Sequence, residues 1–253
     1  MPDLRRGWHL AGLLALCLPA WAESYVVGVE DVDYAPIYSN AGGRYHGYAR
    51  DLLDLFARHE GITLSYQPLP IKRIALYNRQ GKIDLIYPDN PRWNVQEKRG
   101  AVVHYSAATL TFQDAVLVKP ERQGLPMRSL GMVRGFTPWK FQDDIQAGRL
   151  RIENAPGPQN LVQMVLLGRV DGINLAQQVA RYHLNQLGQP AALMPDTRLM
   201  PMQNSQYFLS SVRQPELIAR FDRFLKREHK AVEALQRQYG LLEAATTAKP
   251  GKP

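Results

Sequence analysis

The 253 residues contain a single cysteine, Cys17, which lies close to the N-terminus. Beyond it the chain has no thiol, so disulfides, thiolate metal ligands and a cysteine nucleophile are all excluded from that part. The six histidines show no HxxxH or other metal-binding spacing, and neither a phosphate-binding Gly-Lys-Ser/Thr loop nor a Gly-x-Ser-x-Gly elbow occurs. We therefore expect no cofactor, no metal and no common hydrolase or nucleotide-dependent chemistry.

Long apolar runs are also scarce, and the one clear run lies in residues 1–22. Arg5 and Arg6 precede an apolar stretch from Leu10 to Leu18, and Ala20-Trp21-Ala22 ends it with a small-x-small cleavage site. A membrane span needs roughly 20 apolar residues, more than this stretch provides. The pattern predicts a cleaved secretory signal and a periplasmic protein. Leu16, the large residue before Cys17, argues against lipidation.

Positive charge exceeds negative charge, with a formal net charge of +8. Such a charge suits nucleic acid or an anionic surface, but an exported protein is not expected to meet nucleic acid. The densest basic group, at residues 226–230, lies in a strongly amphipathic segment and indicates a solvated helix face.

Two phrases of nearly the same sequence stand 87 residues apart, Gly81-Lys82-Ile83-Asp84 and Gly168-Arg169-Val170-Asp171. Each follows a helical pattern and opens a short apolar run, which predicts a helix, a glycine C-cap and a buried strand. Around the first phrase the pattern continues as strand, helix, strand, helix, strand, with helices expected at 47–60 and 70–80. Short connections of this kind predict an α/β fold with mainly parallel sheets.

The series runs twice, so we expect two lobes. Residues 109–119 are extended with no turn residue inside, and the chain is extended again near 200–211. These segments predict two hinge strands. We assign residues 23–112 and 205–243 to lobe 1, residues 113–204 to lobe 2, and residues 244–253 to a disordered tail. Ligands of open α/β sheets bind at the carboxyl ends of the strands, which would face a cleft between the lobes.

Five short motifs in a fixed order give the chain a resemblance to a known family. They are Asp33-Tyr34-Ala35-Pro36, Gly47-Tyr48-x-x-Asp51-Leu52, Gly81 to Ile86, Gly131-x-x-x-Gly135-x-Thr137, and Gly168 to Asp171. The chain resembles the type II periplasmic solute-binding proteins, in particular the polar amino-acid (family 3) binding proteins of ABC transporters. The resemblance covers about residues 25–241. It implies a two-lobe fold and a small polar ligand that is passed to a membrane transporter.

The resemblance also implies two groups that hold a ligand carboxylate. Arg99, seven residues before Ser106, stands where the family has a carboxylate-binding arginine, and Arg92 is a rival in the same loop. A guanidinium matches a carboxylate bidentately. Thr137 precedes Pro138, so we expect a helix to start there with Thr137 as its N-cap and an anion site at its free N–H groups.

Other candidate ligand contacts follow from position. Tyr34 would cover the ligand with its ring, and Asp31 would meet a cationic or hydroxylated end. Three residues follow or end the predicted strand 83–87 and are expected to line the cleft: Tyr87, Asp89 and Asn90. Each of these candidates has an alternative structural role, in a loop, a turn or the packing of its own lobe. Asn174, at the end of the strand after the second phrase, could donate a neutral hydrogen bond.

Two positions depart from the family pattern. Ile71 stands where an aromatic residue is usual, and Ala176 stands where an Asp usually holds the ligand's α-ammonium. A standard α-amino acid held in the usual way is therefore in doubt, and a carboxylate without an amino group, or an amino acid held differently, stays open.

We expect a monomeric binding protein and not an enzyme, with a membrane permease or a sensor on another chain as its partner. The alternative is a cyclohexadienyl (prephenate or arogenate) dehydratase-like enzyme, which needs a general acid in the cleft. The segment 175–187, where the resemblance would place that acid near Val179, contains no Asp or Glu.

Overall fold

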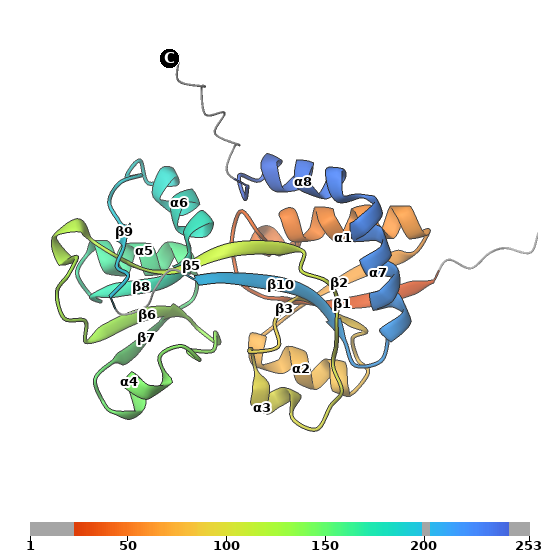
Figure 1. The fold of residues 1–253 in the computed structure, drawn as a ribbon, viewed down its shortest axis with the longest axis horizontal. Coiled ribbons are helices and arrows are strands. Elements are labelled where there is room, and N and C mark those ends of the chain that lie inside the picture. The colour runs from red at the N-terminus through yellow and green to blue at the C-terminus, as the bar shows by residue number, and fades with distance from the viewer. Residues whose placement is uncertain (1–22, 199–202, 243–253) are drawn as a thin grey trace, which may run out of the picture.

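The chain forms two lobes, and two long strands run from one lobe into the other (Figure 1). This computed structural model describes residues 23–198 and 203–242. The predicted signal sequence and the predicted tail lie outside the described residues.

Lobe 1 is the half that contains both ends of the described chain. Its strands are β1 (Ser24–Glu30), β2 (Thr63–Leu69), β3 (Leu85–Asp89) and the short β4 (His104–Tyr105). Its helices are α1 (Tyr48–Glu60), α2 (Ile71–Arg79), α3 (Val95–Lys98), α7 (Pro215–Arg227), α8 (His229–Gln238) and the 3₁₀ turn η1 (Ala41–Gly43). Strand β1 pairs in parallel with β2 and β3, as the strand–helix pattern predicts.

Lobe 2 is built in the same way from the middle of the chain. Its strands are β6 (Ser129–Val133), β7 (Arg151–Ala155), β8 (Gly172–Ala176) and the short β9 (Met194–Pro195). Its helices are α4 (Gln142–Gln146), α5 (Pro158–Leu166), α6 (Gln177–Gln186) and the 3₁₀ turn η2 (Pro120–Arg122). Strand β6 lies between β7 and β8 and is parallel to both.

Strands β5 (Leu110–Val118) and β10 (Gln203–Ser211) connect the lobes. They pair antiparallel with each other from Gln203–Asp114 to Tyr207–Leu110. Beyond that pairing, β5 continues along β8 in lobe 2 and β10 continues along β3 in lobe 1. Both extended segments were expected from the sequence, and both lobe boundaries that we assigned fall inside these continuous strands.

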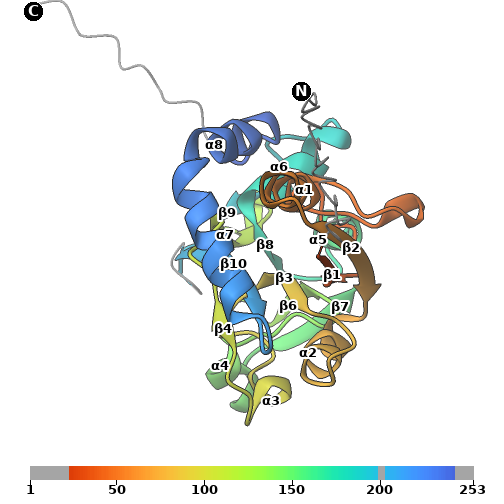
Figure 2. The ribbon, with the colours of Figure 1, turned by 90° about the vertical axis from the view of Figure 1, so that its right-hand side faces the viewer.

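Helices cover both faces of the lobe 1 sheet. Helices α1, α7 and α8 lie together on one side, and α2 and α3 lie on the other (Figure 2). Helix α1 buries Leu52, Leu53 and Phe56, whose spacing puts them toward one side of the helix. Phe56 meets Phe221 and Phe224 of α7 with ring centroids 4.9 and 5.4 Å apart, and all three rings are fully buried. This aromatic contact fixes the C-terminal helices to lobe 1.

The repeated phrase has the same structural role in each lobe. Gly81 and Gly168 are left-handed, with φ of 70° and 69°, and each ends the preceding helix. The basic residue after each glycine donates its N–H back to the helix, Lys82 to Tyr77 and Arg169 to Met164, at 2.9 Å in both cases. This geometry is a helix C-cap of the Schellman type.

The aspartate of each phrase then joins the chain to the first strand of its lobe. Asp84 accepts the Val26 N–H at 2.8 Å through its side chain and donates its own N–H to the Val26 carbonyl. Asp171 does the same with Ser129, at 2.9 Å through the side chain and 3.2 Å through the backbone. The repeated phrase therefore fixes the end of a helix against two neighbouring strands in each lobe. These strands are β1 and β3 in lobe 1, and β6 and β8 in lobe 2.

Candidate functional site

A cavity of about 50 Å³ lies between the lobes, at the carboxyl ends of the parallel strands. Its lining comes from both lobes and both connecting strands. The lining residues used below are Glu30, Tyr34, Trp93, Asn94, Phe112, Asp114, Phe136, Thr137, Trp139, Lys140, Asn174, Ser205 and Tyr207.

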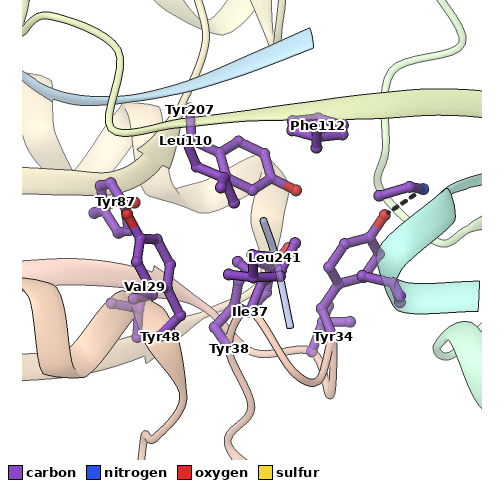
Figure 3. Close-up of a cluster of buried hydrophobic side chains, with 14 of the residues drawn as sticks. Val29, Tyr34, Ile37, Tyr38, Tyr48, Tyr87, Leu110, Phe112, Tyr207 and Leu241 are labelled. Carbon is purple, nitrogen blue, oxygen red and sulfur yellow. Dashed lines mark hydrogen bonds between the residues drawn. The ribbon is translucent and has the colours of Figure 1, made fainter. Parts of the chain in front are cut away.

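The lobes touch each other around this cavity. The Ala176 N–H of lobe 2 donates to the Tyr34 hydroxyl of lobe 1 at 3.3 Å, which Figure 3 shows as a dashed line. The Tyr34 ring also lies 5.4 Å from the Phe136 ring of lobe 2. On another side, the Asn94 N–H donates to Thr137 Oγ1 at 3.3 Å. These contacts close the cleft over the cavity.

A partly buried ion pair joins lobe 2 to strand β5 at the cavity. Lys140 Nζ lies 2.7 Å from Asp114 Oδ2, and the Lys140 side chain is only 6% exposed. Asn174 donates to the other carboxylate oxygen of Asp114 at 2.9 Å and to the Ala115 carbonyl at 3.1 Å. Asp114, whose side chain is 17% exposed, is therefore neutralised by a lysine and hydrogen-bonded on both oxygens, as a carboxylate with little access to water requires.

A second carboxyl group, Glu30 at the end of β1, faces the cavity from lobe 1. Glu30 is 4% exposed, and its Oε2 accepts a hydrogen bond from the Tyr38 hydroxyl. Burial raises the pKa of the Glu30 carboxyl to about 7; the Tyr38 hydrogen bond opposes this rise and the nearby Asp89 charge adds to it. Among residues 23–198 and 203–242, no lysine, arginine or histidine forms an ion pair with Glu30.

Aromatic rings form much of the remaining wall. The Tyr207 ring lies 4.5 Å from Phe112 and 5.6 Å from Trp93, so three rings are continuous along the connecting strands and lobe 1. In Figure 3, Tyr207 and Phe112 lie on the opposite side of the close-up from Tyr34 and Tyr38. Tyr34 stacks on Tyr38 at 5.3 Å. The cavity thus combines two carboxyl groups and one lysine with a mainly aromatic surface.

Three of the residues expected from the sequence line this cavity: Tyr34, Thr137 and Asn174. Thr137 does so from a different local structure than predicted. Arg134 and Gly135 form a turn after β6, and α4 begins only at Gln142, with Phe141 as its N-cap. The prediction of a helix starting at Thr137 is wrong, and the Thr137 hydroxyl accepts the Asn94 N–H instead of capping a helix.

The other expected residues lie elsewhere. Arg99 is exposed and lines a shallow depression beside α3. Asp31 is exposed, is bonded by Asn40 at 2.9 Å, and lines a surface groove on another side of the lobe contact. Tyr87 is buried in the lobe 1 core and shares a hydrogen bond with Thr109 (Figure 3 shows its ring among the core residues).

The polar residues after β3 have structural partners. Asp89 is buried, receives hydrogen bonds from Lys98 at 2.5 Å and Ser210 at 2.6 Å, and burial raises its pKa. Asn90 is bonded to the Gln206 carbonyl at 2.8 Å. Asn90 and Arg92 line a depression that adjoins the cavity and shares Trp139, Lys140 and Ser205 with it. The loop between β3 and α3 is therefore held by Asp89 and reaches the cavity through Trp93 and Asn94.

The sequence reasoning missed Glu30, Asp114 and Lys140. A signal was present for two of them: Glu30 directly follows a segment with strand character, residues 25–29, and Asp114 is an acidic residue in the middle of the extended hinge segment 109–119. Lys140 offered none, because only the turn after β6 places it against β5.

In the part of the chain that the structure describes, no group of three or more His, Cys, Asp or Glu side chains is placed to hold a metal ion. No helix among the described residues is long and apolar enough to cross a membrane.

Comparison with known proteins also indicates a two-lobe solute-binding fold. The family model for bacterial extracellular solute-binding proteins, family 3, matches residues 25–241. A histidine-bound substrate-binding protein of an ABC uptake transporter from Streptococcus pneumoniae is 17% identical with a TM-score of 0.71, over 88% of this chain and 95% of that one. No curated protein matches the chain.

Two other solved structures have the same fold. A histidine kinase sensor domain with similarity to periplasmic binding proteins is 18% identical with a TM-score of 0.69, over 88% of this chain and 99% of that one. An ancestral amino acid-binding protein, a precursor of cyclohexadienyl dehydratase, is 19% identical with a TM-score of 0.65, over 85% and 95%. At these identities the likeness concerns the fold.

Proposed function

We propose that this chain, which belongs to the bacterial extracellular solute-binding proteins of family 3, captures a small polar ligand in the interlobe cavity for a membrane transporter. The observation that carries the proposal is the composition of the cavity wall. Residues from both lobes and both connecting strands meet around one space, so closure of the lobes would enclose a ligand. The protein would act in the periplasm as a monomer, after removal of residues 1–22.

We further propose that the ligand bears a carboxylate, as an amino acid or a related compound does. Arg99 does not line the cavity and lies in a separate depression. Two donors at the cavity take its place. The Thr137 hydroxyl accepts a hydrogen bond from the Asn94 N–H and can still donate its own proton. Lys140 donates one of its three N–H groups to Asp114, which leaves two for a ligand.

Tyr34 and Asn174 have supporting roles in this proposal. The Tyr34 ring would pack on the ligand, and its hydroxyl already links the lobes through the Ala176 N–H. Asn174 is committed to Asp114 and the Ala115 carbonyl, so it would act by orienting the Asp114–Lys140 pair. Asp31, Tyr87, Asp89 and Asn90, which lie outside the cavity, would shape lobe 1 without touching the ligand.

The test is a thermal-shift screen of the purified protein against carboxylates, amino acids and polyamines, followed by calorimetry. A ligand present at 100 times its dissociation constant should add about 2.7 kcal/mol of stability. Thr137→Val and Lys140→Met should each weaken a carboxylate hit, whereas Arg99→Ala should not. A hit whose affinity falls only in Arg99→Ala would place binding outside the cavity and refute the proposal.

Two alternatives have specific support and separate tests. Glu30, with its raised pKa, is a cavity group able to act as a general acid, which a dehydratase-like enzyme requires. Turnover of prephenate or arogenate by the purified protein would establish that function, and its absence favours binding alone.

The sensor-domain relative supports the second alternative, in which the protein presents its bound form to a membrane receptor. Pull-down with membrane fractions in the presence and absence of a hit would reveal such a partner.

A further inference from the structure

The two carboxyl groups at the cavity differ in one respect. Asp114 has Lys140 as its counter-ion and a hydrogen bond on each oxygen. Glu30 has only the Tyr38 hydroxyl, and no cationic side chain in the described chain pairs with it. Since a buried ionised carboxylate without a partner is costly, the Glu30 site is complete only when something else supplies positive charge or a proton.

The surroundings of Glu30 suit an organic cation. Tyr34, Trp93, Phe112 and Tyr207 line the same cavity, and aromatic faces attract ammonium groups. Burial, together with the charges of both Glu30 and Asp114, raises the pKa of the Tyr34 and Tyr207 phenols, so both phenols lie near both carboxyl groups. A cation placed against Glu30 would therefore also meet aromatic surface.

The lobe 2 position at which the family resemblance implies an acid for the ligand's ammonium group has no acid in this chain. Ala176 replaces the expected acid in lobe 2, and its N–H is already bonded to the Tyr34 hydroxyl. The free donors of lobe 2, Thr137 and Lys140, suit an anion instead. Lobe 1 thus contributes a carboxyl group without a cationic partner to the cavity, whereas lobe 2 contributes a carboxylate paired with Lys140 and free donors.

We propose that Glu30 binds the amino group, or another organic cation, of the ligand, so that the cationic end lies on lobe 1 and the carboxylate end on lobe 2. This rests on the proposed function and names the ligand class as a small zwitterion or amine. It differs from what the family resemblance implies, in which both lobes hold the carboxylate, through Arg99 and Thr137, and an acid in lobe 2 holds the ammonium.

The proposal has a consequence for pH. The groups that face Glu30 are the phenols of Tyr34, Tyr38, Tyr45 and Tyr207 and the carboxylate of Asp89, with Asp114 and Lys140 at the same cavity. Burial keeps the phenols protonated, so Glu30 is the group that exchanges a proton near neutrality. An amine that binds the ionised carboxylate must displace that proton, and its affinity should rise between pH 6 and pH 8.

The experiment compares compounds that differ only in an amino group, such as 4-aminobutyrate with butyrate and alanine with propionate. Calorimetry is performed on the protein purified from expression of the full chain, as wild type, as Glu30→Gln, and as Glu216→Gln, a matched change at an exposed site on α7. We expect the amino compound of a pair to bind at least about tenfold more tightly than its partner in wild type and in Glu216→Gln. In Glu30→Gln that preference should disappear.

The possible results separate the proposed binding function of the cavity from the proposed role of Glu30. A carboxylate that binds equally well with and without its amino group, in wild type and in Glu30→Gln, supports the cavity function and overturns the role of Glu30. Failure of every carboxylate, amino acid and amine to bind overturns both. If Glu30→Gln does not fold, the pH series on wild type decides, because an amine affinity that is constant from pH 6 to pH 8 contradicts the displaced proton.

Discussion

Replacement of Glu30 by glutamine should make the protein more stable above neutral pH relative to wild type. The substitution keeps the shape of the protonated side chain and an oxygen that can accept the Tyr38 hydrogen bond, and it removes the ionisable group. In the folded protein the pKa of Glu30 is raised from 4.5 to about 7. The folded state therefore holds the proton more tightly than the unfolded state.

The sign and size of the effect follow from this linkage. Between pH 4.5 and about 7 the folded protein binds more protons at this site than the unfolded chain, so the contribution of Glu30 to stability falls as pH rises. The shift corresponds to about 3 kcal/mol. That contribution is fully present below pH 4 and lost above pH 8. Glutamine does not titrate, so the unfolding free energy of the Glu30→Gln variant does not fall at this site as the pH rises.

The measurement is urea-induced unfolding of wild type and variant at several pH values from 4 to 8.5. Other titrating groups are common to both proteins and cancel in the difference of unfolding free energies. This difference should move by about 3 kcal/mol in favour of Glu30→Gln between the two ends of the range. The exposed control Glu216→Gln should show no comparable change. A difference for Glu30→Gln that does not vary with pH would refute the burial and orientation of Glu30 described here.

Three further variants test other parts of the structure. Lys140→Met should lower the unfolding free energy by about 1–3 kcal/mol, because the partly buried Asp114 carboxylate loses its counter-ion, and adding Asp114→Asn should recover part of the loss in urea unfolding. Asp171→Ala should cost about 1–3 kcal/mol, because the N–H of Ser129 loses its side-chain acceptor at the start of β6; hydrogen exchange of that amide should quicken. Arg99→Ala should change neither the affinity for a cavity ligand nor the unfolding free energy by more than about 0.5 kcal/mol; a large loss of affinity by calorimetry would restore Arg99 as the anchor.

The fold was predictable from the sequence because its signals are local. Helix α1 has an apolar face and a glycine at its end, and β5 is an uninterrupted extended segment. The repeated Gly-basic-x-Asp phrase marks the same point in each lobe, and its cause is visible in the structure. The aspartate must accept an N–H of the lobe's first strand, so the phrase reports a contact between segments far apart in the chain.

The site was less predictable because its residues meet only in the folded protein. Tyr34 could be located from its place in the loop after a strand, and Asn174 from its place at the end of a predicted strand. Lys140 reaches Asp114 through a turn that replaces the expected helix start at Thr137. Arg99 was inferred from its spacing to Ser106, but the loop before it, between Asp84 and Arg99, is longer than the family pattern. Helix α3 and the Asp89–Lys98 contact hold that loop so that Arg99 faces solvent. Spacing arguments fail where a loop changes length, since the loop can fold back on a new partner.

The tryptophans offer the most direct test of the central claim that a ligand binds between the lobes. Trp8 and Trp21 lie in residues 1–22, so a protein expressed from Glu23 onward has only Trp93 and Trp139. Both line the interlobe cavity, one from each lobe. Titration of a ligand found by calorimetry should therefore change the intrinsic tryptophan emission saturably, with the calorimetric dissociation constant. A ligand that binds by calorimetry and leaves the emission unchanged would contradict the account.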